Sequence, residues 1–482
     1  MNKRDMFRYL DENKDVMTGV SDKIWDYAET AFEEFRSAAL VKDVTLKHGF
    51  DVKSGIGGID TAFCAAFGTG APVIGILAEY DALSGLSQEA GSTERREATV
   101  GGCGHGCGHN LFAGASVGAA IAVKEYMADN RLPGTVKLFG CPGEEGGSGK
   151  AFMARAGAFN DLDAAFAWHP MSVNAILDMS MLANYQVLYK FKGVASHAAS
   201  APDKGRSALD AVELMNVGVN FLREHVIQEA RIHYAITNSG GFSPNVVQPY
   251  AEVLYLIRAP RTPQVEEIYQ RVNKIARGAA LMTETDLEIQ FIKACANVIP
   301  NKTLSKTLYD NLTELDLPAY TQDELAFARE IAKTSPGSAS SDIGRYLSAH
   351  PADMKRCLER LEGKAMCDIV LPFYFDDPDR ILAGSSDVGD VSWIVPTGQV
   401  VTACYSLGTP EHSWQLVSQV KTSVGHKGMI LAAKAMAGGA ADALESPEMI
   451  KNAKAELANR LGGKTYRSAI PPDVMPRAIN KI

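Results

Sequence analysis

Hydrophobic positions near the amino terminus recur at the spacing of a helix. Ile24, Ala28, Phe32 and Phe35 follow one another at intervals of four and three residues. This spacing places apolar side chains on one face of a helix. The sequence therefore predicts an amphipathic helix that enters the fold within residues 1 to about 50.

Short unbroken apolar runs follow, separated by helical patterns. They cover residues 71–78, 134–141, 164–168 and 400–405. Continuous apolar segments of this length are typical of strands buried on both faces of a parallel sheet. The first three runs end beside acidic residues or a histidine, and open α/β sheets bind ligands at the carboxyl ends of their strands. The sequence thus predicts an α/β fold with a mostly parallel sheet, helices on both faces and a site at the sheet edge.

The pattern changes near residue 183, where residues 185–192 alternate like a half-exposed strand. A helix, two strands, a helix and a strand are expected next, over residues 205–225, 231–237, 247–257, 263–282 and 285–292. This β-α-β-β-α-β order matches a ferredoxin-like module. We therefore predict an α+β domain over residues 183–299, inserted into a first domain of residues 1–182 and 300–482. Helical patterns resume after residue 300, and no element is predicted from about 335 to 385.

Composition and charge narrow the class of protein. A chain of 482 residues exceeds the size at which one core stops growing, which favours two domains. A net charge of -9 without a Lys/Arg block disfavours nucleic acid and membrane surfaces as partners. The chain starts without an apolar signal peptide, and no segment is expected to reach the roughly 20 apolar residues of a membrane span. Eight irregularly spaced cysteines do not form a disulfide scaffold, so a cytoplasmic location is expected.

The segment 104–110 contains Cys107 and His109 between glycines. Glycine lets the backbone fold tightly around a small ion, and thiolate with imidazole suits zinc or another borderline divalent metal. The alternatives are a loop with a chance Cys and His, or a structural zinc knuckle that includes Cys103. A structural site would require a second closely spaced Cys/His pair, which the sequence lacks. A catalytic metal site is therefore favoured.

Three further positions suit the same chemistry. Glu144 and Glu145 follow an apolar strand and are flanked by glycines, although adjacent carboxylates are also common on surfaces. Because adjacent side chains diverge, one carboxylate can bind metal while the other faces the substrate as a general base. His169 and His412 each lie just beyond an apolar strand, which favours a ligand over a structural histidine.

Taken together, the motifs resemble the M20 family of metallopeptidases and amidohydrolases, in particular its N-acyl amino acid hydrolases. The resemblance covers nearly the whole chain and rests on segments 78–83, 105–110, 143–146, 168–170, 193–199 and 205–210. It implies a zinc-peptidase-like catalytic domain with an inserted lid that forms a dimer. It also implies five ligands for two divalent metal ions, zinc or manganese: Cys107 as the bridge, His109, Glu145, His169 and His412.

The resemblance also implies roles for residues outside the ligand set. Glu144 is expected to be the general base, and His197 is expected to reach a partner's active site and stabilise the oxyanion. Asn245 and Arg258 are expected to hold the substrate, Arg258 by pairing with an amino acid carboxylate. From the residues alone, Asn245 could instead cap a turn and Arg258 could be a surface strand residue.

The expected activity is metal-dependent hydrolysis of an N-acyl amino acid. Residues 141–150 and 237–241 favour p-aminobenzoyl-glutamate as the substrate by their resemblance. The alternatives are another N-acyl amino acid, a dipeptide, or a subunit that completes the site of a related chain, so that either a homodimer or a heterodimer is expected. A structural or storage metal protein is disfavoured because such a site requires no Glu-Glu pair.

Overall fold

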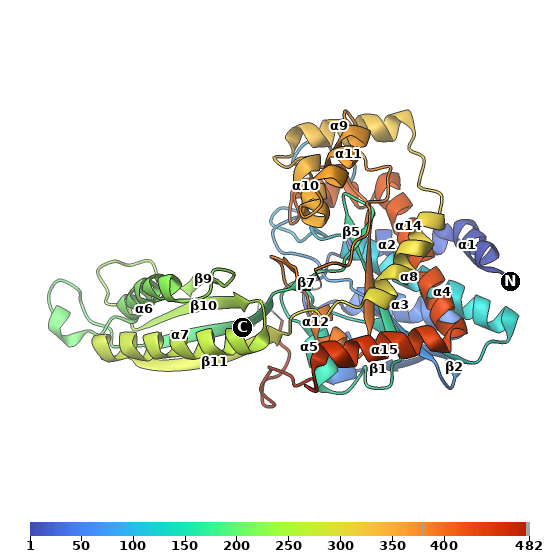
Figure 1. Ribbon diagram of the computed structural model, residues 1–482. Helices are drawn as coiled ribbons and strands as arrows, with labels where there is room; N and C mark the ends of the chain where they lie inside the picture. The colour runs from blue at the N-terminus through green and yellow to red at the C-terminus, as the bar shows by residue number, and fades with distance from the viewer. Residues whose placement is uncertain (378, 479–482) are drawn as a thin grey trace.

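A seven-stranded mixed sheet forms the main body of the computed structural model, which describes residues 1–377 and 379–478 (Figure 1). Its strand order is β1-β2-β4-β3-β5-β13-β6. The strands are β1 (Asp51–Ser54), β2 (Phe63–Thr69), β3 (Val73–Ala78), β4 (Gly134–Gly140), β5 (Ala164–Met171), β6 (Ala175–Ile176) and β13 (Thr397–Ala403). The central strands β4, β3, β5 and β13 are parallel, whereas β1, β2 and β6 pair antiparallel at the edges. The prediction of a mostly parallel sheet is therefore right only for its centre.

Two long apolar helices pack against each other and against the central strands: α4 (His109–Asn130) and α14 (Ser423–Glu445). By length and composition α4 is the one helix of the described residues that could cross a membrane, so the expectation that no segment reaches this limit was wrong. Of its most apolar window, 83% is buried. A helix that is apolar on all sides is explained here by burial between α2, α14 and the sheet.

The amino-terminal region contains three helices where the sequence predicted one. They are α1 (Lys3–Glu12), α2 (Lys14–Tyr27) and α3 (Phe35–Lys47). Ala28 at φ 43° and Phe32 at φ 64° adopt left-handed backbone conformations, which stop α2 and redirect the chain. Phe35 is 57% exposed and does not belong to the apolar face that Ile24 buries.

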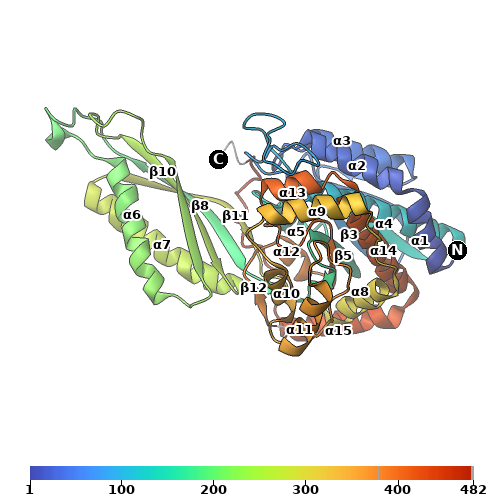
Figure 2. The same cartoon turned by 90° about the horizontal axis from the view of Figure 1, so that it is seen from above.

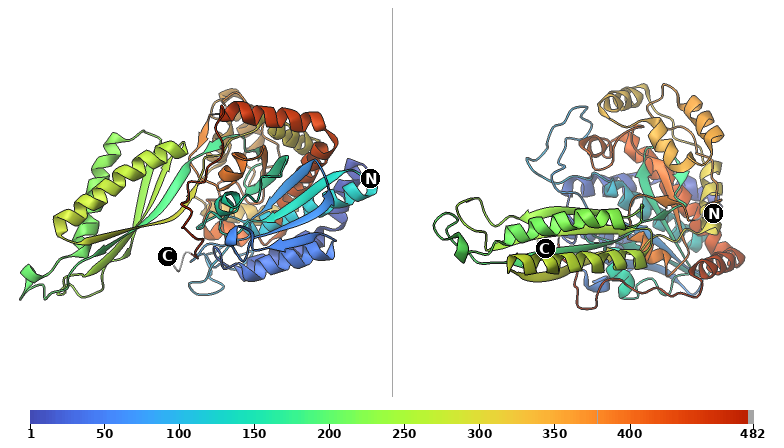
Figure 3. Two further views of the ribbon diagram at one scale, coloured as in Figure 1. Left: turned by 90° about the horizontal axis from the view of Figure 1, so that it is seen from below. Right: turned by 60° about the vertical axis from the view of Figure 1, so that its left-hand side comes forward.

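Residues 183–295 form a separate four-stranded antiparallel sheet of order β11-β8-β10-β9, with two helices packed on one face. In chain order the elements are β8 (Ala183–Lys192), α6 (Ala208–Leu222), β9 (Arg231–Asn238), β10 (Tyr250–Ala259), α7 (Thr262–Thr283) and β11 (Asp286–Cys295). This is the β-α-β-β-α-β order predicted from the sequence. The unit, called the arm below, projects from the main body (Figure 2). Its outer end lies far from the central sheet in both views of Figure 3.

The stretch without a sequence prediction contains helices that pack over the ends of β5 and β13. The helices are α9 (Gln322–Thr334), α10 (Ala339–Leu347) and α11 (Pro351–Leu361), seen at the top of Figure 1. Ile343, Leu347 and Leu361 join Val401 in a small core of their own. The strand β12 (Ile381–Leu382) then pairs in parallel with β7 (Ser180–Met181). The remaining helices are α5 (Gly149–Arg155), α8 (Lys302–Glu314), α12 (Val388–Ser392), α13 (Trp414–Gln419) and α15 (Pro447–Leu461).

Close packing of α4 generates a stability prediction. A Cβ at Gly114 would lie 2.5 Å from Met429 Sδ and 2.8 Å from the Met17 carbonyl oxygen. Gly114→Ala should therefore lower the free energy of unfolding by about 1–3 kcal/mol, measured by chemical denaturation. The matched control is Gly278→Ala in α7, where a Cβ meets nothing within 4 Å. It should stabilise by about 0.5–1 kcal/mol through helix propensity, and equal effects of the two changes would contradict the packing account.

Candidate active site

Strand ends of the main sheet bring the candidate residues to one edge. Glu79 and Asp81 follow β3, Glu144 and Glu145 follow β4, and His169 lies near the end of β5. His109 begins α4, and His412 lies in the loop after β13. Because β3, β4, β5 and β13 are parallel, their carboxyl ends meet at the same edge.

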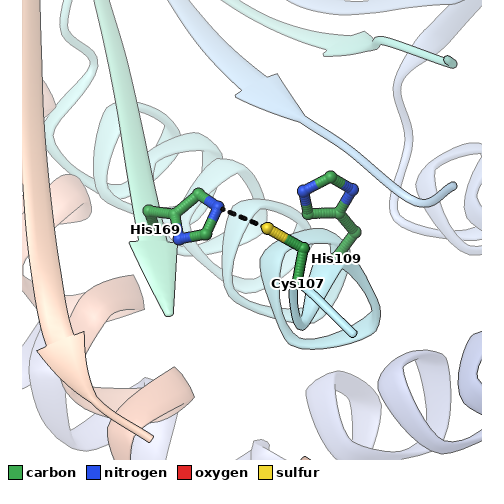
Figure 4. Close-up of side chains that lie close together, drawn as sticks. All are labelled: Cys107, His109 and His169. Atoms are coloured by element: carbon green, nitrogen blue, oxygen red, sulfur yellow. Dashed lines mark hydrogen bonds between the residues drawn. The ribbon is translucent and has the colours of Figure 1, made fainter. Parts of the chain in front are cut away.

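Cys107, His109 and His169 converge at this edge (Figure 4). Cys107 Sγ lies 3.3 Å from His169 Nε2, and the ligand atoms of all three residues lie within 4.8 Å of one another. Gly108 between Cys107 and His109 has a φ of 76°, a conformation that favours glycine. This turn lets a thiol and an imidazole two residues apart face the same point.

Hydrogen bonds at the far side of each ring set the orientation of the two histidines. His109 Nδ1 donates to Asp81 Oδ1 at 2.9 Å, and His169 Nδ1 donates to the Pro170 carbonyl oxygen at 2.9 Å. Both Nε2 atoms are then free to bind a metal ion. Burial alone would lower the pKa of His109, but the carboxylates of Asp81 and Glu79 outweigh it and raise the pKa to about 10. Asp81 is thus an orienting residue.

Glu145 and His412 form the second half of the cluster. Glu145 Oε1 lies 3.2 Å from His412 Nε2, and Glu145 N–H donates to Asp81 Oδ2 at 2.9 Å. His412 has a φ of 56°, and its N–H donates to the Gly106 carbonyl oxygen at 2.8 Å. The loop after β13 is therefore held against the loop that carries Cys107. Cys107, Glu145 and His412 form a second set of potential ligand atoms within 4.8 Å of one another.

The side chains present suit two divalent cations. His109 Nε2 and Glu145 Oε1 are buried and have no hydrogen-bond partner among the described residues. Burial and the neighbouring carboxylates of Glu145 and Glu144 raise the pKa of the Cys107 thiol well above its usual range. A bound cation would offset this repulsion and stabilise the thiolate. Cys107 belongs to both ligand sets, as a bridging residue requires.

Glu144 lies beside the cluster as a carboxyl group in an anionic environment. Burial, together with Glu79, Asp387 and Glu145, raises its pKa well above the usual range. It lines a cavity of about 390 Å³ together with Cys107 and His412. A carboxyl group that holds a proton readily, next to potential metal ligands, suits general acid-base chemistry.

A fully buried ion-pair network supports the cluster and was not foreseen from the sequence. Lys150 Nζ lies 2.6 Å from Glu79 Oε1 and 2.6 Å from Asp387 Oδ1, and all three side chains are at most 2% exposed. Glu79 Oε2 in turn lies 3.2 Å from His109 Nε2. The position of Asp387 in a segment that resembles a family loop was the only signal, because a buried lysine has no mark in a single sequence.

The cavity extends from the ligand cluster to the base of the arm. Apolar side chains form part of its wall: Phe112, Trp168, Met171, Leu177, Met181, Leu256, Leu382 and Val401. The arm contributes Arg258, whose Nη1 donates to Ser385 Oγ at 3.2 Å. The structure thus places Arg258 in the same cavity as Glu144 and the predicted ligands.

His197 and Asn245 do not line this cavity. They are exposed, and they lie together on the arm, where Ala198 N–H donates to the Asn245 carbonyl oxygen at 3.0 Å. His197 Nδ1 accepts hydrogen bonds from the N–H groups of Ala199 and Ser200, each at 3.2 Å. Nε2 of the neutral ring therefore carries the hydrogen and can act as a donor. Within one chain the structure does not bring these two residues to the metal-ligand cluster.

Comparison with known proteins gives a consistent family assignment. The model of peptidase family M20/M25/M40 matches residues 75–315. One of the subunits of p-aminobenzoyl-glutamate hydrolase from Escherichia coli (strain K12) is 46% identical over 98% of this chain and 99% of its own length. An Xaa-Arg dipeptidase of Mus musculus is 32% identical over 71% of this chain and 76% of its own length.

Solved structures share the fold at lower sequence identity. An aminobenzoyl-glutamate utilization protein from Klebsiella pneumoniae is 17% identical with a TM-score of 0.59, covering 92% of this chain and 98% of that one. The Bacillus subtilis protein YXEP, described as a dinuclear metal binding peptidase, is 16% identical with a TM-score of 0.52, covering 89% of this chain and 98% of that one. With the family match and the relative that spans nearly the full length, these findings show that the chain is a hydrolase that belongs to peptidase family M20/M25/M40.

Proposed function

We propose that this protein is a two-metal amidohydrolase that cleaves p-aminobenzoyl-glutamate into p-aminobenzoate and glutamate. The observation that carries the proposal is the pair of ligand sets that share Cys107 and border the cavity of Glu144 and Arg258. The full-length relative from Escherichia coli is named for hydrolysis of this compound.

Five side chains would hold the metal ions: Cys107 between the two, with His109, His169, Glu145 and His412 around them. A pair of divalent cations would polarise the scissile carbonyl group and lower the pKa of a water molecule. The same ligand types accept zinc and manganese, and thiolate with imidazole favours zinc. Asp81 would fix His109 through its Nδ1–H hydrogen bond.

Glu144 would act as the general base. Its carboxylate would accept a proton from the attacking water and transfer that proton to the leaving nitrogen. The carboxylates of Glu79, Asp387 and Glu145 raise the pKa of Glu144, which strengthens it as a proton acceptor. Tight binding of the proton at this side chain suits its delivery to an amine leaving group.

The cavity supports an aromatic acyl group joined to an anionic amino acid. Its apolar wall includes Phe112 and Trp168, which offer ring faces and edges to a benzoyl group. Arg258 lines the opposite, arm side of the cavity, and its guanidinium group matches the geometry of a carboxylate. Another N-acyl amino acid or a dipeptide would use the same hydrolytic groups, so substrate choice depends on these walls.

We further propose that the arm pairs with a second chain, either a copy of this one or a related subunit. Its edge strand β9 exposes Tyr234 and Ile236, and α6 exposes Val217 and Phe221. An unpaired edge strand beside exposed apolar side chains is suited to association. Pairing would carry His197 of one chain toward the cavity of the other. Eight unpaired cysteines support a reducing location such as the cytoplasm.

The metal assignment predicts different effects at two nearby cysteines. Cys107→Ala should lower the content of bound metal after dialysis, because it removes the ligand common to both sets. Cys103→Ala should leave it unchanged, since Cys103 belongs to neither set. Elemental analysis of the purified proteins measures both outcomes, and full metal content in Cys107→Ala would exclude the bridging role.

Glu144→Gln should reduce kcat by about 10²–10⁴-fold, the usual contribution of general acid-base catalysis. The metal content should be retained, because Gln preserves the shape of the side chain and Glu144 is not one of the proposed ligands. Steady-state kinetics on p-aminobenzoyl-glutamate together with elemental analysis test both statements. Turnover near that of the unmodified protein would remove the assignment of the base.

Mixing two inactive variants tests the role of His197 across the dimer. His197→Ala and Glu144→Gln proteins should each have low activity, and exchange of subunits should restore part of it, because mixed dimers contain one intact site. Activity that stays low after demonstrated subunit exchange would contradict a role in trans. If the unmodified chain is inactive alone and active only with a related chain, it completes a heterodimer.

A further inference from the structure

Two cationic side chains in the cavity wall of the arm have no anionic partner among the described residues. Arg258 contacts Ser385 Oγ, and its Nε is buried without a hydrogen-bond partner in that part of the chain. Lys293 is 6% exposed, and its ammonium group makes no ion pair or hydrogen bond with any residue that the structure describes. The third cation that lines the cavity, Arg345, pairs with Glu411. A buried charge without a partner is costly, so the first two await an anion.

A bulge in β11 directs Lys293 toward the cavity. Phe291 lies opposite Val187 of β8, but Lys293 rather than Ile292 lies opposite Gln186. Without the extra residue, strand alternation would place Lys293 on the helix side of the sheet, where Phe291 contacts Tyr185. Bulges next to active sites commonly redirect a side chain in this way. The irregularity therefore has a consequence for the site: it exchanges an isoleucine for an ammonium group in the cavity wall.

The strand register places six side chains of the arm on the face that borders the cavity. Arg258, Asn184 and Cys295 form one row across the sheet, and Leu256, Gln186 and Lys293 form the next row. Arg258 and Lys293 lie two strands apart, a spacing of roughly 10 Å, which two long side chains can close from either side. An anionic group held between them would lie on the arm side of the cavity, across from Glu144.

We propose that Lys293 is a specificity-determining residue that binds the side-chain carboxylate of the substrate's amino acid, while Arg258 binds the α-carboxylate. The site would thereby select acyl derivatives of dicarboxylic amino acids, glutamate above aspartate because of its longer reach. This inference rests on the proposed amidohydrolase function. A merely structural lysine at this position is disfavoured, because no described carboxylate or carbonyl group holds its ammonium group.

The test compares two substrates that differ in a single charge, p-aminobenzoyl-glutamate and p-aminobenzoyl-glutamine. The unmodified protein should prefer the glutamate compound. Lys293→Met should reduce kcat/KM for that compound by about 10–100-fold, the usual effect of losing a hydrogen bond between charged groups, and leave the glutamine compound nearly unchanged. Lys293→Arg should keep the preference.

Lys190→Met is the matched control. Lys190 lies on the same face of the arm, but it pairs with Glu288 and does not line the cavity. Its loss should not alter the preference for glutamate. Glutarate and its monoamide, tested as inhibitors of the unmodified protein, provide a measurement that does not depend on folding of a variant, and glutarate should bind more tightly.

The outcomes separate this inference from the hydrolase assignment. Equal cleavage of both substrates by the unmodified protein, equal losses on both in Lys293→Met, or equal inhibition by the two acids would overturn the role of Lys293 and leave the amidohydrolase in place. Failure of the metal-loaded protein to cleave either compound, alone or with a related chain, would overturn the proposed function itself.

Discussion

Repulsion between buried anionic groups is the constraint on which this site depends. Glu79, Asp81, Glu144, Glu145 and Cys107 are gathered at one edge of the sheet, largely out of water. Removing such groups from solvent is costly unless cations or hydrogen bonds compensate. Lys150 compensates for Glu79 and Asp387, and His109 for Asp81. The thiol and carboxylates that remain leave a deficit of positive charge where two metal ions would bind.

The topology of the sheet satisfies this constraint with little additional structure. Parallel central strands deliver their carboxyl ends to one edge, and the first turn of α4 places His109 among them. The loops are then fixed to one another through main-chain contacts, such as the bond from His412 N–H to Gly106. The ligand geometry is therefore set by hydrogen bonds between loops as much as by the strands.

Features with a regular local pattern were predictable from the sequence, and features that depend on distant contacts were not. The order of elements in the arm follows from alternation and periodicity, and the cysteine, histidine and glutamate motifs lie at strand ends as expected. The breaks at Ala28 and Phe32, the packing of α10 and α11, and the Lys150 network depend on tertiary partners. His197 and Asn245 are adjacent as expected, but their relation to the cavity involves a second chain that one sequence does not specify.

The arm joins the main body through neighbouring ends of two paired strands. The chain enters at Ala183 and leaves at Cys295, and Asn184 lies opposite Cys295 in the ladder. A unit with adjacent ends can be lengthened, shortened or exchanged during evolution without disturbing the fold that receives it. The cavity residues Asn184, Arg258 and Lys293 would travel with such a unit. Recombination at this junction would thus transplant selectivity for the leaving amino acid while the hydrolytic machinery stays behind.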